Sequence, residues 1–455
     1  MDKNYVKILK KYDDKIPYYS VARECLDLMK ETIPQNQVFY STTVVVTAPV
    51  LVTYVWWVLH EAKNRGISRL YFLARDGYIL HKIANHFCDR FNLDIECKYL
   101  YCSRASLRLP TYHFIGDEAY KLLFLGGYSL TPNNVLHRIQ MSDEERREIY
   151  LSTGIEDENK VLSKAEFKDF CNALKSNKIF TEAVRERSIE AYNNTIGYLK
   201  QEGLFDRKEV AIVDSGWTGS MQRSLRQLLS NETSSPELTG FYFGLYTSQK
   251  EEDGVYLTWY FSHYAKRSIL SKFNNNLFEC LCSAPHAMTI GYSKTGDRYV
   301  PIFKDEISQQ SEKCYLINLQ IEGIINFTER LMQKISFDDF DKNILYNQTK
   351  KLLQNLMYKP SPMEAYTYGT FTFCDDISEY YKFRLADESQ EDQIKSYLLI
   401  YRIHRKLFAR KSKKEYKSEL YWPYGSLALS NLEPKWWYRL NLYMWDMLRY
   451  YLSRR

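Results

Sequence analysis

Two stretches of this chain share one pattern: a short apolar run, then an acidic residue and a glycine, then an amphipathic helix. The first stretch is YFLARDGYIL at 71–80, and the second is EVAIVDSGWTGSMQRSL at 209–225. A short, continuous apolar run is typical of a strand that is buried on both faces, as in a parallel sheet. The pattern therefore predicts an α/β protein in which each of these strands ends in a polar loop and continues into a helix.

The residues around the first stretch extend the pattern to helix, strand, loop, helix and strand. An apolar segment with Pro49 at its start predicts a buried helix that ends at Gly66. Two strands and a second helix follow it along the chain. The expected elements are a helix at 49–66, a strand at 68–74, a helix at 78–90 and a strand at 95–103.

Residues 112–208 have a helical and polar pattern that interrupts the sheet, with a long helix expected at 181–202. The sheet resumes with a strand at 209–214, a helix at 221–229 and a strand at 238–246. We expect five segments: an N-terminal helical segment (1–48), the first part of the α/β core (49–111), a helical insertion or cap (112–208), the second part of the core (209–299) and a mostly helical C-terminal region (300–455).

The charge balance and the cysteines limit the classes of ligand and the compartment. The net charge is +6, from 62 Lys and Arg against 56 Asp and Glu. This mild excess permits a phosphate-bearing ligand or an anionic surface and does not indicate nucleic acid. The nine cysteines form no C-x-x-C pair, and the N-terminus has no apolar signal core. We expect a cytoplasmic protein.

One uncharged segment, 38–59, is long enough to span a bilayer. It contains five Ser or Thr residues and two Tyr, and Pro49 lies near its middle. Two interpretations remain open: a membrane span, and the buried helix described above, which the polar content favours.

The loop after the second strand has the composition of a site for a phosphorylated sugar. The turn SGWTGS at 215–220 joins a strand to a helix, so its backbone N–H groups and the helix dipole favour a phosphate. The hydroxyls of Thr218 and Ser220 add donors. Asp214, at the strand tip, repels phosphate but suits sugar hydroxyls or a metal ion. Ser and Thr also cap helices without any ligand.

Two further polar clusters follow other strands. Arg75 can pair with phosphate oxygens, Asp76 can hold a metal ion, and Gly77 lets the backbone approach a ligand closely. Arg104 and Arg108 come just after the next strand. Ligands of open α/β sheets bind at the carboxyl ends of the strands. Together the three clusters indicate a ligand with phosphate at both ends and a hydroxylated middle, although each alone also fits a turn or a surface cation.

These motifs resemble those of type I phosphoribosyltransferases. VDSGWTGS at 213–220 looks like their phosphoribosyl diphosphate motif, and ARDG at 74–77 looks like their short diphosphate-binding loop. The order of the blocks, with YLYCSR at 99–104 and FECLCSAPH at 278–286, is more similar to the glycan-directed phosphoribosyltransferases of bacterial polysaccharide loci. In that group the module is often fused to a haloacid-dehalogenase-type phosphatase. The matching blocks span residues 49–292.

The resemblance implies a fold and a function. The fold would be the parallel sheet core of a type I phosphoribosyltransferase, with Mg²⁺ as cofactor. The enzyme would move ribofuranose 5-phosphate from phosphoribosyl diphosphate to a hydroxyl of a lipid-linked oligosaccharide acceptor and release diphosphate. This transfer would serve capsule or O-antigen synthesis, and a separate phosphatase would later remove the 5-phosphate.

The resemblance also implies roles for particular residues. Asp214 would contact the ribose hydroxyls, and Asp76 and Asp214 would hold Mg²⁺. Residues 75–77 would bind the diphosphate, and Arg104 would neutralise its charge as it leaves. Ser215 stands where the family has a second acid, which is a departure from the pattern. The expected donor-binding residues are Thr218, Gly219, Ser220 and Met221 around the 5-phosphate, with Arg75, Gly77, Arg104, Arg108, Ser215, Gly216 and Trp217 elsewhere in the site.

The proposed transfer needs a group that takes the proton of the acceptor hydroxyl. As the diphosphate leaves, C1 of the donor develops oxocarbenium character, and Mg²⁺ and arginines stabilise the departure. A nearby carboxylate can act as the base. The candidates are Glu279, Asp76 and His286. Glu279 also fits a helix-surface or N-cap acid, and His286 also fits a structural histidine.

Two other functions remain open. A haloacid-dehalogenase-type phosphatase needs an Asp-x-Asp at a strand end, and Asp339 and Asp341 do not follow a buried strand. A non-catalytic phosphosugar-binding or scaffold module would keep the fold and the ligand contacts without turnover.

The C-terminal stretch at 434–455 is aromatic, apolar and basic, with Asp446 as its lone acid. Such rings settle at the headgroup level of a bilayer and cations favour anionic lipid, which predicts peripheral contact with the inner face of the cell membrane. Alternatively, residues at steps of three and four can dock a helix onto the core. These residues are Leu440, Tyr443, Met447 and Tyr451.

Overall fold

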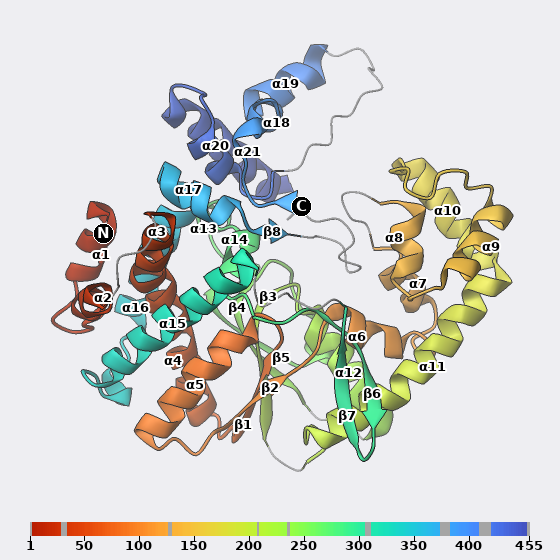
Figure 1. Ribbon diagram of the computed structural model, residues 1–455, viewed down its shortest axis with the longest axis horizontal. Coiled ribbons are helices and arrows are strands. Elements are labelled where there is room, and N and C mark those ends of the chain that lie inside the picture. Colours follow the sequence, from red (N-terminus) through yellow and green to blue (C-terminus); the bar gives the residue numbers. More distant parts are fainter. Residues whose placement is uncertain are drawn as a thin grey trace.

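A five-stranded parallel sheet lies at the centre of the computed structural model (Figure 1). The finding confirms the predicted α/β class with a parallel sheet. The structure describes residues 2–28, 34–125, 130–206, 209–233, 237–304, 311–373, 383–408 and 420–452. The strands of the sheet are β1 (Arg69–Leu73), β2 (Glu96–Leu100), β3 (Val210–Trp217), β4 (Thr239–Leu245) and β5 (Val255–Phe261), in the order β2-β1-β3-β4-β5.

The strand order reverses direction between β1 and β3. From β1 the chain adds β2 on one side, and it then crosses to β3 on the other side and continues outward through β4 and β5. Such a reversal opens a crevice at the carboxyl ends of the two central strands, where α/β proteins bind ligands. Phe72 of β1 pairs with Val213 of β3. The loops that follow these two strands therefore start side by side.

Alternate residues of the sheet contribute to two separate cores, one on each face. Leu70 and Phe72 belong to the larger core, whereas Tyr71 and Leu73 belong to the smaller one. This alternation follows from the pleat of a strand, and helices on both faces are what a parallel sheet requires. The larger core includes α4 (Ala48–Asn64) and α5 (Gly77–Phe91), and the smaller core includes parts of α11 (Lys178–Gln201) and α12 (Ser220–Glu232).

Strand β3 is longer than the sequence predicted. It continues past Asp214 to Trp217, and Gly216 and Trp217 pair with Gly244 and Leu245 of β4. A Cβ atom at position 216 would lie 2.1 Å from the carbonyl oxygen of Gly244, so the close pairing here requires glycine. The Ser-Gly sequence had indicated a loop, but the backbone remains in the sheet.

Five of the described strands were not predicted. One is β5, at the edge of the sheet, two form the antiparallel hairpin of β6 (Thr289–Thr295) and β7 (Arg298–Phe303), and the other two form a short pair in the C-terminal region. Most of the β7 side chains are exposed or half-buried, so the hairpin lacks the apolar run of a buried strand. The expected boundary between residues 299 and 300 divides this hairpin and does not mark a structural break.

The apolar segment near the N-terminus is a buried helix that starts earlier than predicted. Helix α3 (Pro34–Thr42) leads through a π-helical turn (Thr43–Thr47) into α4, so Pro49 lies inside a long helical run. Because proline lacks a backbone N–H, a wider turn beside it accommodates the missing hydrogen bond. The run from Asn36 to Asn64 has a mean hydropathy of 1.7 in its most apolar window, and all of that window is buried within the protein.

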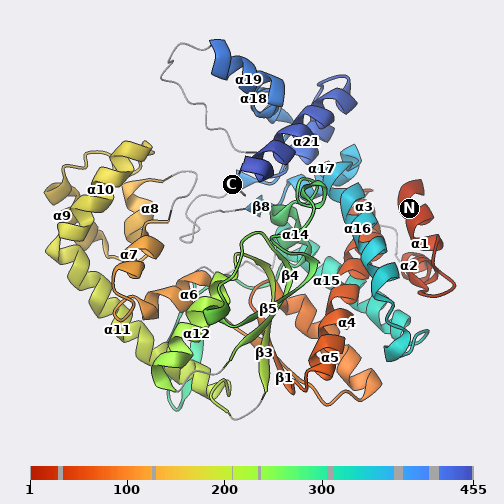
Figure 2. The ribbon, with the colours of Figure 1, turned by 180° about the vertical axis from the view of Figure 1, so that it is seen from behind.

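The predicted insertion forms a helical lobe with its own hydrophobic core. Figure 2 shows this lobe beside the sheet, with α11 running from the lobe to the sheet. A capping box at Ser142 begins one of its helices, as the helix-start signal there indicated, and a second capping box at Ser163 begins another. Its core residues, such as Ile149 and Phe170, are separate from the two cores of the sheet. The helices are α7 (Asp117–Leu123), α8 (Pro132–His137), α9 (Asp143–Thr153), α10 (Lys164–Ser176) and α11.

The C-terminal region is mostly helical, as predicted, but part of it belongs to the main core. Helices α15 (Glu312–Met332) and α16 (Lys342–Tyr358) pack on α4, and the N-terminal helices α1 (Lys3–Lys10) and α2 (Tyr18–Asp27) pack on them in turn. The remaining helices are α17 (Pro362–Gly369), α18 (Glu391–Tyr397), α19 (Leu399–Phe408), α20 (Pro423–Leu429) and α21 (Lys435–Leu452). Two short strands, β8 (Thr372–Phe373) and β9 (Phe383–Arg384), pair beside α17.

Helix α21 docks on the protein through two of the predicted residues, Tyr443 and Tyr451, but not through Leu440. Tyr443 meets the ring of Tyr358 edge to face, and the guanidinium of Arg267 lies 4.6 Å from the ring of Tyr451. Leu440 was expected in the docked face but is exposed, and the buried apolar residue of α21 is Leu442. The cations Arg454 and Arg455 lie outside the described residues.

Candidate active site

The candidate site lies at the carboxyl ends of β1 and β3, where the strand order reverses. Asp76 follows β1 at the start of α5. Asp214 lies in the buried part of β3, near its carboxyl end. Ser215 donates a hydrogen bond from its hydroxyl to the carboxylate of Asp76. This bond joins the two predicted loops, and it shows what Ser215 contacts at the position where a second acid was expected.

Three carboxyl groups gather in this crevice. Burial raises the pKa of Asp214 well above its usual range, and the charges of Asp76 and Glu279 raise it further. Burial also raises the pKa of Asp76, against the hydrogen bond from Ser215. The backbone N–H groups of Ser215 and Gly216 oppose the shift at Asp214 by donating to its carboxylate. Clustered, buried acids of this kind are typical of functional sites.

Glu279 reaches the site from α14 (Asn275–Leu281), and Trp217 holds it there. The indole N–H of Trp217 donates to the Glu279 carboxylate over 2.8 Å. Burial, followed by the charge of Asp76, raises the pKa of Glu279 to about 7. A group with this pKa exchanges protons readily near neutral pH. Glu279 is therefore neither a helix-surface acid nor an N-cap, the two plainer interpretations of its sequence.

Arginine side chains balance the acids. The charges of Arg75 and Arg104 lower the pKa of both Asp76 and Glu279, which places the two cations beside the two acids. Arg104 is exposed at the first position of the short helix α6 (Arg104–Arg108). Arg75 is half-buried, so Arg104 is the more accessible of the two cations for an anionic ligand.

Arg108 is a buried cation that faces the predicted phosphate turn. Its guanidinium donates to the hydroxyl of Ser220 over 3.0 Å, and only 7% of the residue is exposed. Within the described part of the chain, no carboxylate lies at ion-pair distance from it. Burial lowers the pKa of Arg108 to about 10, and neighbouring cations add to this effect. These cations are Arg104, Arg138 and Arg223.

The turn at 218–220 has the geometry of an anion site. Gly219 adopts a positive φ of 66° directly before α12, a conformation that favours glycine, and Ser220 is the first residue of that 13-residue helix. The helix N-terminus, the Ser220 hydroxyl and the Arg108 guanidinium therefore converge. Thr218 is exposed beside them, and Met221 is half-buried against the smaller core.

The close approach at Gly77 is to the protein itself. A Cβ atom at position 77 would lie 2.7 Å from the carbonyl carbon of Phe72, so glycine lets α5 begin directly against β1. The prediction that Gly77 opens the backbone to a ligand is thus not needed to explain this residue. Trp217 likewise packs its ring among aromatic residues. These are Tyr246, Phe261, Phe273 and Phe278.

The acidic residues fit a Mg²⁺ ion that is shared with a phosphate ligand. Mg²⁺ is usually bound through one or two carboxylates, with water and substrate phosphate oxygens completing its shell. Asp76 and Asp214 supply two carboxylates whose mutual repulsion a cation would relieve. Among the described residues, no group of three or more His, Cys, Asp or Glu side chains is arranged as a metal cage. Two carboxylates suit a Mg²⁺ ion whose remaining ligands are water and phosphate oxygens of a substrate.

An aromatic group around His286 borders the site and was largely missed by sequence reasoning. The Tyr99 hydroxyl lies 2.6 Å from His286 Nε2, and Nδ1 of the ring lies 2.8 Å from the carbonyl oxygen of Ala287. The rings of Tyr78 and Tyr101 pack on the same imidazole. Burial lowers the pKa of His286. The alternating tyrosines of YLYCSR were the available signal.

Comparisons with known proteins do not add to this geometry. No protein-family model matches the chain, and no curated protein matches it. The residues that the fold brings together are therefore the evidence for function. Of the predicted site residues, those on the loops after β1, β2 and β3 converge with Glu279.

Proposed function

We propose that this protein is a phosphoribosyltransferase that transfers ribofuranose 5-phosphate from phosphoribosyl diphosphate to a hydroxyl of a lipid-linked glycan. The observation that carries the proposal is the placement of three unlike groups at one strand reversal. The turn that Arg108 faces, the acidic cluster and the two arginines Arg75 and Arg104 all lie at the carboxyl ends of neighbouring strands. Together these groups suit a ligand with a phosphate, a ribose and a diphosphate.

In this proposal the donor lies across the ends of β1 and β3. The 5-phosphate accepts hydrogen bonds at the turn 218–220 and from Arg108, which the phosphate would supply with its missing countercharge. Asp214 accepts from the ribose hydroxyls. Arg75 and Arg104 bind the diphosphate, and Mg²⁺ held by Asp76 and Asp214 would supply additional charge neutralisation for the leaving group.

The chemical step exchanges one bond at C1 of the ribose for another. The C1–O bond to diphosphate breaks with both electrons going to the leaving oxygen, and the acceptor oxygen forms the new C1–O bond. The acceptor proton passes to Glu279. Its pKa of about 7 suits this transfer better than the group at His286, whose imidazole is held by Tyr99 and Ala287. Asp76 is already engaged by Ser215.

We also propose that the enzyme works at the inner face of the cell membrane. Five large apolar side chains at steps of four form an exposed stripe along α21, and α19, which packs against α21, exposes three more. The sequence at 399–419 has eight Lys and Arg residues and one Glu before Glu419, and these cations favour anionic lipid. The stripe consists of Trp436, Leu440, Met444, Leu448 and Leu452, and the α19 residues are Ile400, Tyr401 and Ile403.

The alternative functions have less support. Asp339 ends a short 3-10 turn and Asp341 caps α16, so neither stands at the end of a described strand as a haloacid-dehalogenase-type nucleophile requires. A non-catalytic binding module would share the donor site. The raised pKa of Glu279 favours a catalytic protein, because a binding module gains nothing from a buried acid that titrates near neutrality.

The test has two stages and uses the full chain. Calorimetry with phosphoribosyl diphosphate and Mg²⁺ should show binding that inorganic diphosphate displaces, and absence of binding would overturn the proposal. Incubation with a lipid-linked oligosaccharide extract should then release diphosphate and add a pentose phosphate to the glycan by mass spectrometry. Binding without release would support the non-catalytic module. A pentose without phosphate would refute the need for a separate phosphatase.

A further inference from the structure

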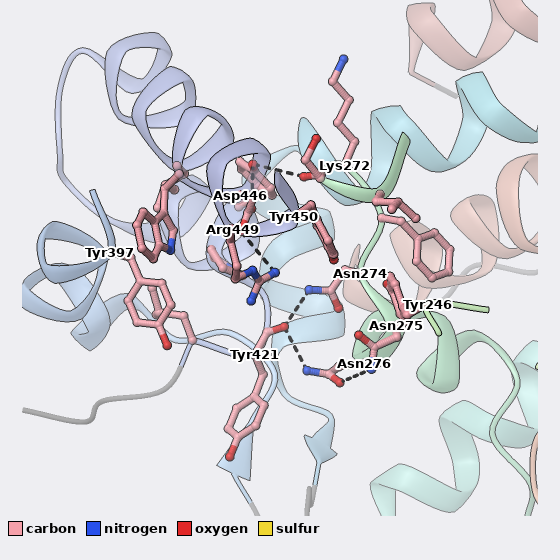
Figure 3. A pocket seen from close by; sticks show the side chains of 18 residues that line it. Tyr246, Lys272, Asn274, Asn275, Asn276, Tyr397, Tyr421, Asp446, Arg449 and Tyr450 are labelled. Atoms are coloured by element: carbon pink, nitrogen blue, oxygen red, sulfur yellow. Dashed lines mark hydrogen bonds and ion pairs between the residues drawn. The ribbon is translucent and has the colours of Figure 1, made fainter. Parts of the chain in front are cut away.

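A pocket of about 190 Å³ lies beside the candidate active site, outside all of the predicted site residues (Figure 3). It lies between the end of β4, the segment that leads into α14, the segment before α20, and α21. Cavities that enclose drug-sized ligands usually measure about 300–1,000 Å³. This pocket therefore has room for a small ligand such as one sugar ring. Its lining includes Tyr246, Asn274, Asn275, Asn276, Asp446 and Tyr450.

The lining has the chemistry of a site for a neutral, hydroxylated ring. Three consecutive asparagines offer amide groups that both donate and accept hydrogen bonds. Tyr246 and Tyr450 both line the pocket and stack on each other, with ring planes 10° apart, so they give the pocket a fixed aromatic wall.

The pocket lining holds one acid, Asp446, which would repel a phosphate, and two cations, Arg449 and Lys272. Asp446 lies 3.3 Å from Arg449, and its carboxylate is 3.5 Å from the Tyr424 hydroxyl. Only 19% of the Asp446 side chain is exposed. Lys272 points away from the cavity in Figure 3, and its ammonium lies over the rings of Tyr358 and Tyr443. The Asp446 carboxylate can accept hydrogen bonds from the hydroxyl groups of a sugar, and Arg449 can donate to them.

One helix joins this pocket to the acidic cluster. Asn275, in the pocket, and Glu279, in the cluster, are four residues apart on α14, so they lie on one face about 6 Å apart along the helix axis. Trp217 forms a second connection. Its indole N–H binds Glu279, and its ring packs against Tyr246 and Phe273 of the pocket lining. A ring in the pocket would therefore hold its neighbour in the chain close to Glu279.

We propose that this pocket binds a neutral sugar residue of the acceptor glycan and so positions the receiving hydroxyl beside Glu279. The inference rests on the proposed transfer to a glycan. It places the acceptor between the start of α14 and α21, where the pocket lies. The donor occupies the opposite side, toward α6 and α12. The two substrates thus meet at the carboxylate that takes the proton.

The probe is a panel of methyl glycosides of common neutral hexoses and N-acetylhexosamines, measured by saturation-transfer NMR on the full chain. At least one glycoside should bind with millimolar affinity. Asn275→Leu should weaken that binding at least tenfold, because its amide contacts only Asn276 among the described hydrogen bonds and does not cap the helix. Asp446→Asn should also weaken binding while keeping the shape of the side chain. The matched control is Asn347→Leu, an exposed asparagine on α16.

The outcomes separate the pocket from the proposed function. If no glycoside binds, or if Asn275→Leu and Asp446→Asn bind it as well as the control does, the pocket is not a sugar site. Calorimetry with phosphoribosyl diphosphate is run on the same variants and should give unchanged affinity. The protein could bind a glycoside through the pocket and yet fail to bind phosphoribosyl diphosphate. That result would support the sugar site and contradict the proposed transferase function.

Discussion

Trp217 and Glu279, 62 residues apart in the chain, are joined by a 2.8 Å hydrogen bond from the indole N–H to the carboxylate. Trp217 is the last residue of β3, and Glu279 lies on α14. The bond fixes the acid against the end of the sheet, beside Asp76 and Asp214. It also lowers the pKa of Glu279 against the larger effects of burial and of Asp76.

Removing this hydrogen bond should shift the pH dependence of turnover. In Trp217→Phe the ring packing is largely kept but the donor is lost, so the pKa of Glu279 should rise above about 7. The rising limb of kcat against pH should move to higher pH in a diphosphate-release assay. The control is Trp259→Phe, because its buried indole N–H makes no hydrogen bond to the described residues. Equal pH profiles for the two variants would contradict a positioning role for Trp217.

Glu279 should also make stability depend on pH. Its folded pKa of about 7 exceeds the usual 4.5, so the folded state holds a proton that the unfolded state has released between these values. The free energy of unfolding should therefore fall as pH rises from about 4.5 to about 7. Glu279→Gln should reduce this fall by about 1–3 kcal/mol between pH 5 and pH 7.5 in urea denaturation. Glu186→Gln, an exposed acid on α11, should leave the difference unchanged.

Loss of charge at Asp214 or Asp76 should abolish turnover without unfolding the protein. Asn keeps the shape at each position, and its neutral amide removes one of three mutually repelling acids. We expect kcat to fall about 100-fold or more, since contacts to ribose and Mg²⁺ weaken. The melting temperature should stay constant or rise. Asp297→Asn, in the exposed turn of the hairpin, is the control. Near-normal turnover of Asp214→Asn would mean that the ribose is held elsewhere.

Arg108 should matter for the donor more than for the fold. In Arg108→Met the guanidinium that faces Ser220 is lost, and affinity for phosphoribosyl diphosphate should fall about tenfold or more, roughly 1.4 kcal/mol. Arg69→Met is a matched control. Arg69 is equally buried, but it pairs with Glu96 and Asp206 at the opposite end of β1. If the two variants bind the donor equally well by calorimetry, the turn at 218–220 is not a phosphate site.

The exposed stripe of α21 should bind anionic vesicles. Full-length protein should float with phosphatidylglycerol vesicles at low salt, and the triple variant Leu440→Gln, Met444→Gln and Leu448→Gln should float several-fold less. Truncation of α21 is a poorer test, because Leu442 and Tyr450 pack into the core. The control is Leu151→Gln, which removes an even more exposed apolar residue from the insertion lobe. Identical flotation of the wild-type protein and the triple variant would show that the stripe does not contact lipid.

The sequence alone predicted those strands and helix starts whose pattern lies within one short segment. The apolar runs that end in Arg75-Asp76-Gly77 and in Asp214-Ser215-Gly216 identified two central strands and the loops after them, because a buried parallel strand needs no partner to be recognised. The capping residue Ser142 marked a helix start for the same reason. The hairpin β6–β7 carried no such signal, since its exposed side chains follow neither period.

The tertiary structure alone decided which of these segments meet. The reversal of strand order placed the loops of β1 and β3 side by side, and no local pattern specifies which strands become neighbours. It brought Glu279 to the acids and gave it a pKa near 7, which depends on burial and on charges from distant parts of the chain. The pocket between Asn275 and Asp446 likewise exists only after α21 has docked, because side chains 171 residues apart become neighbours through packing and not through sequence.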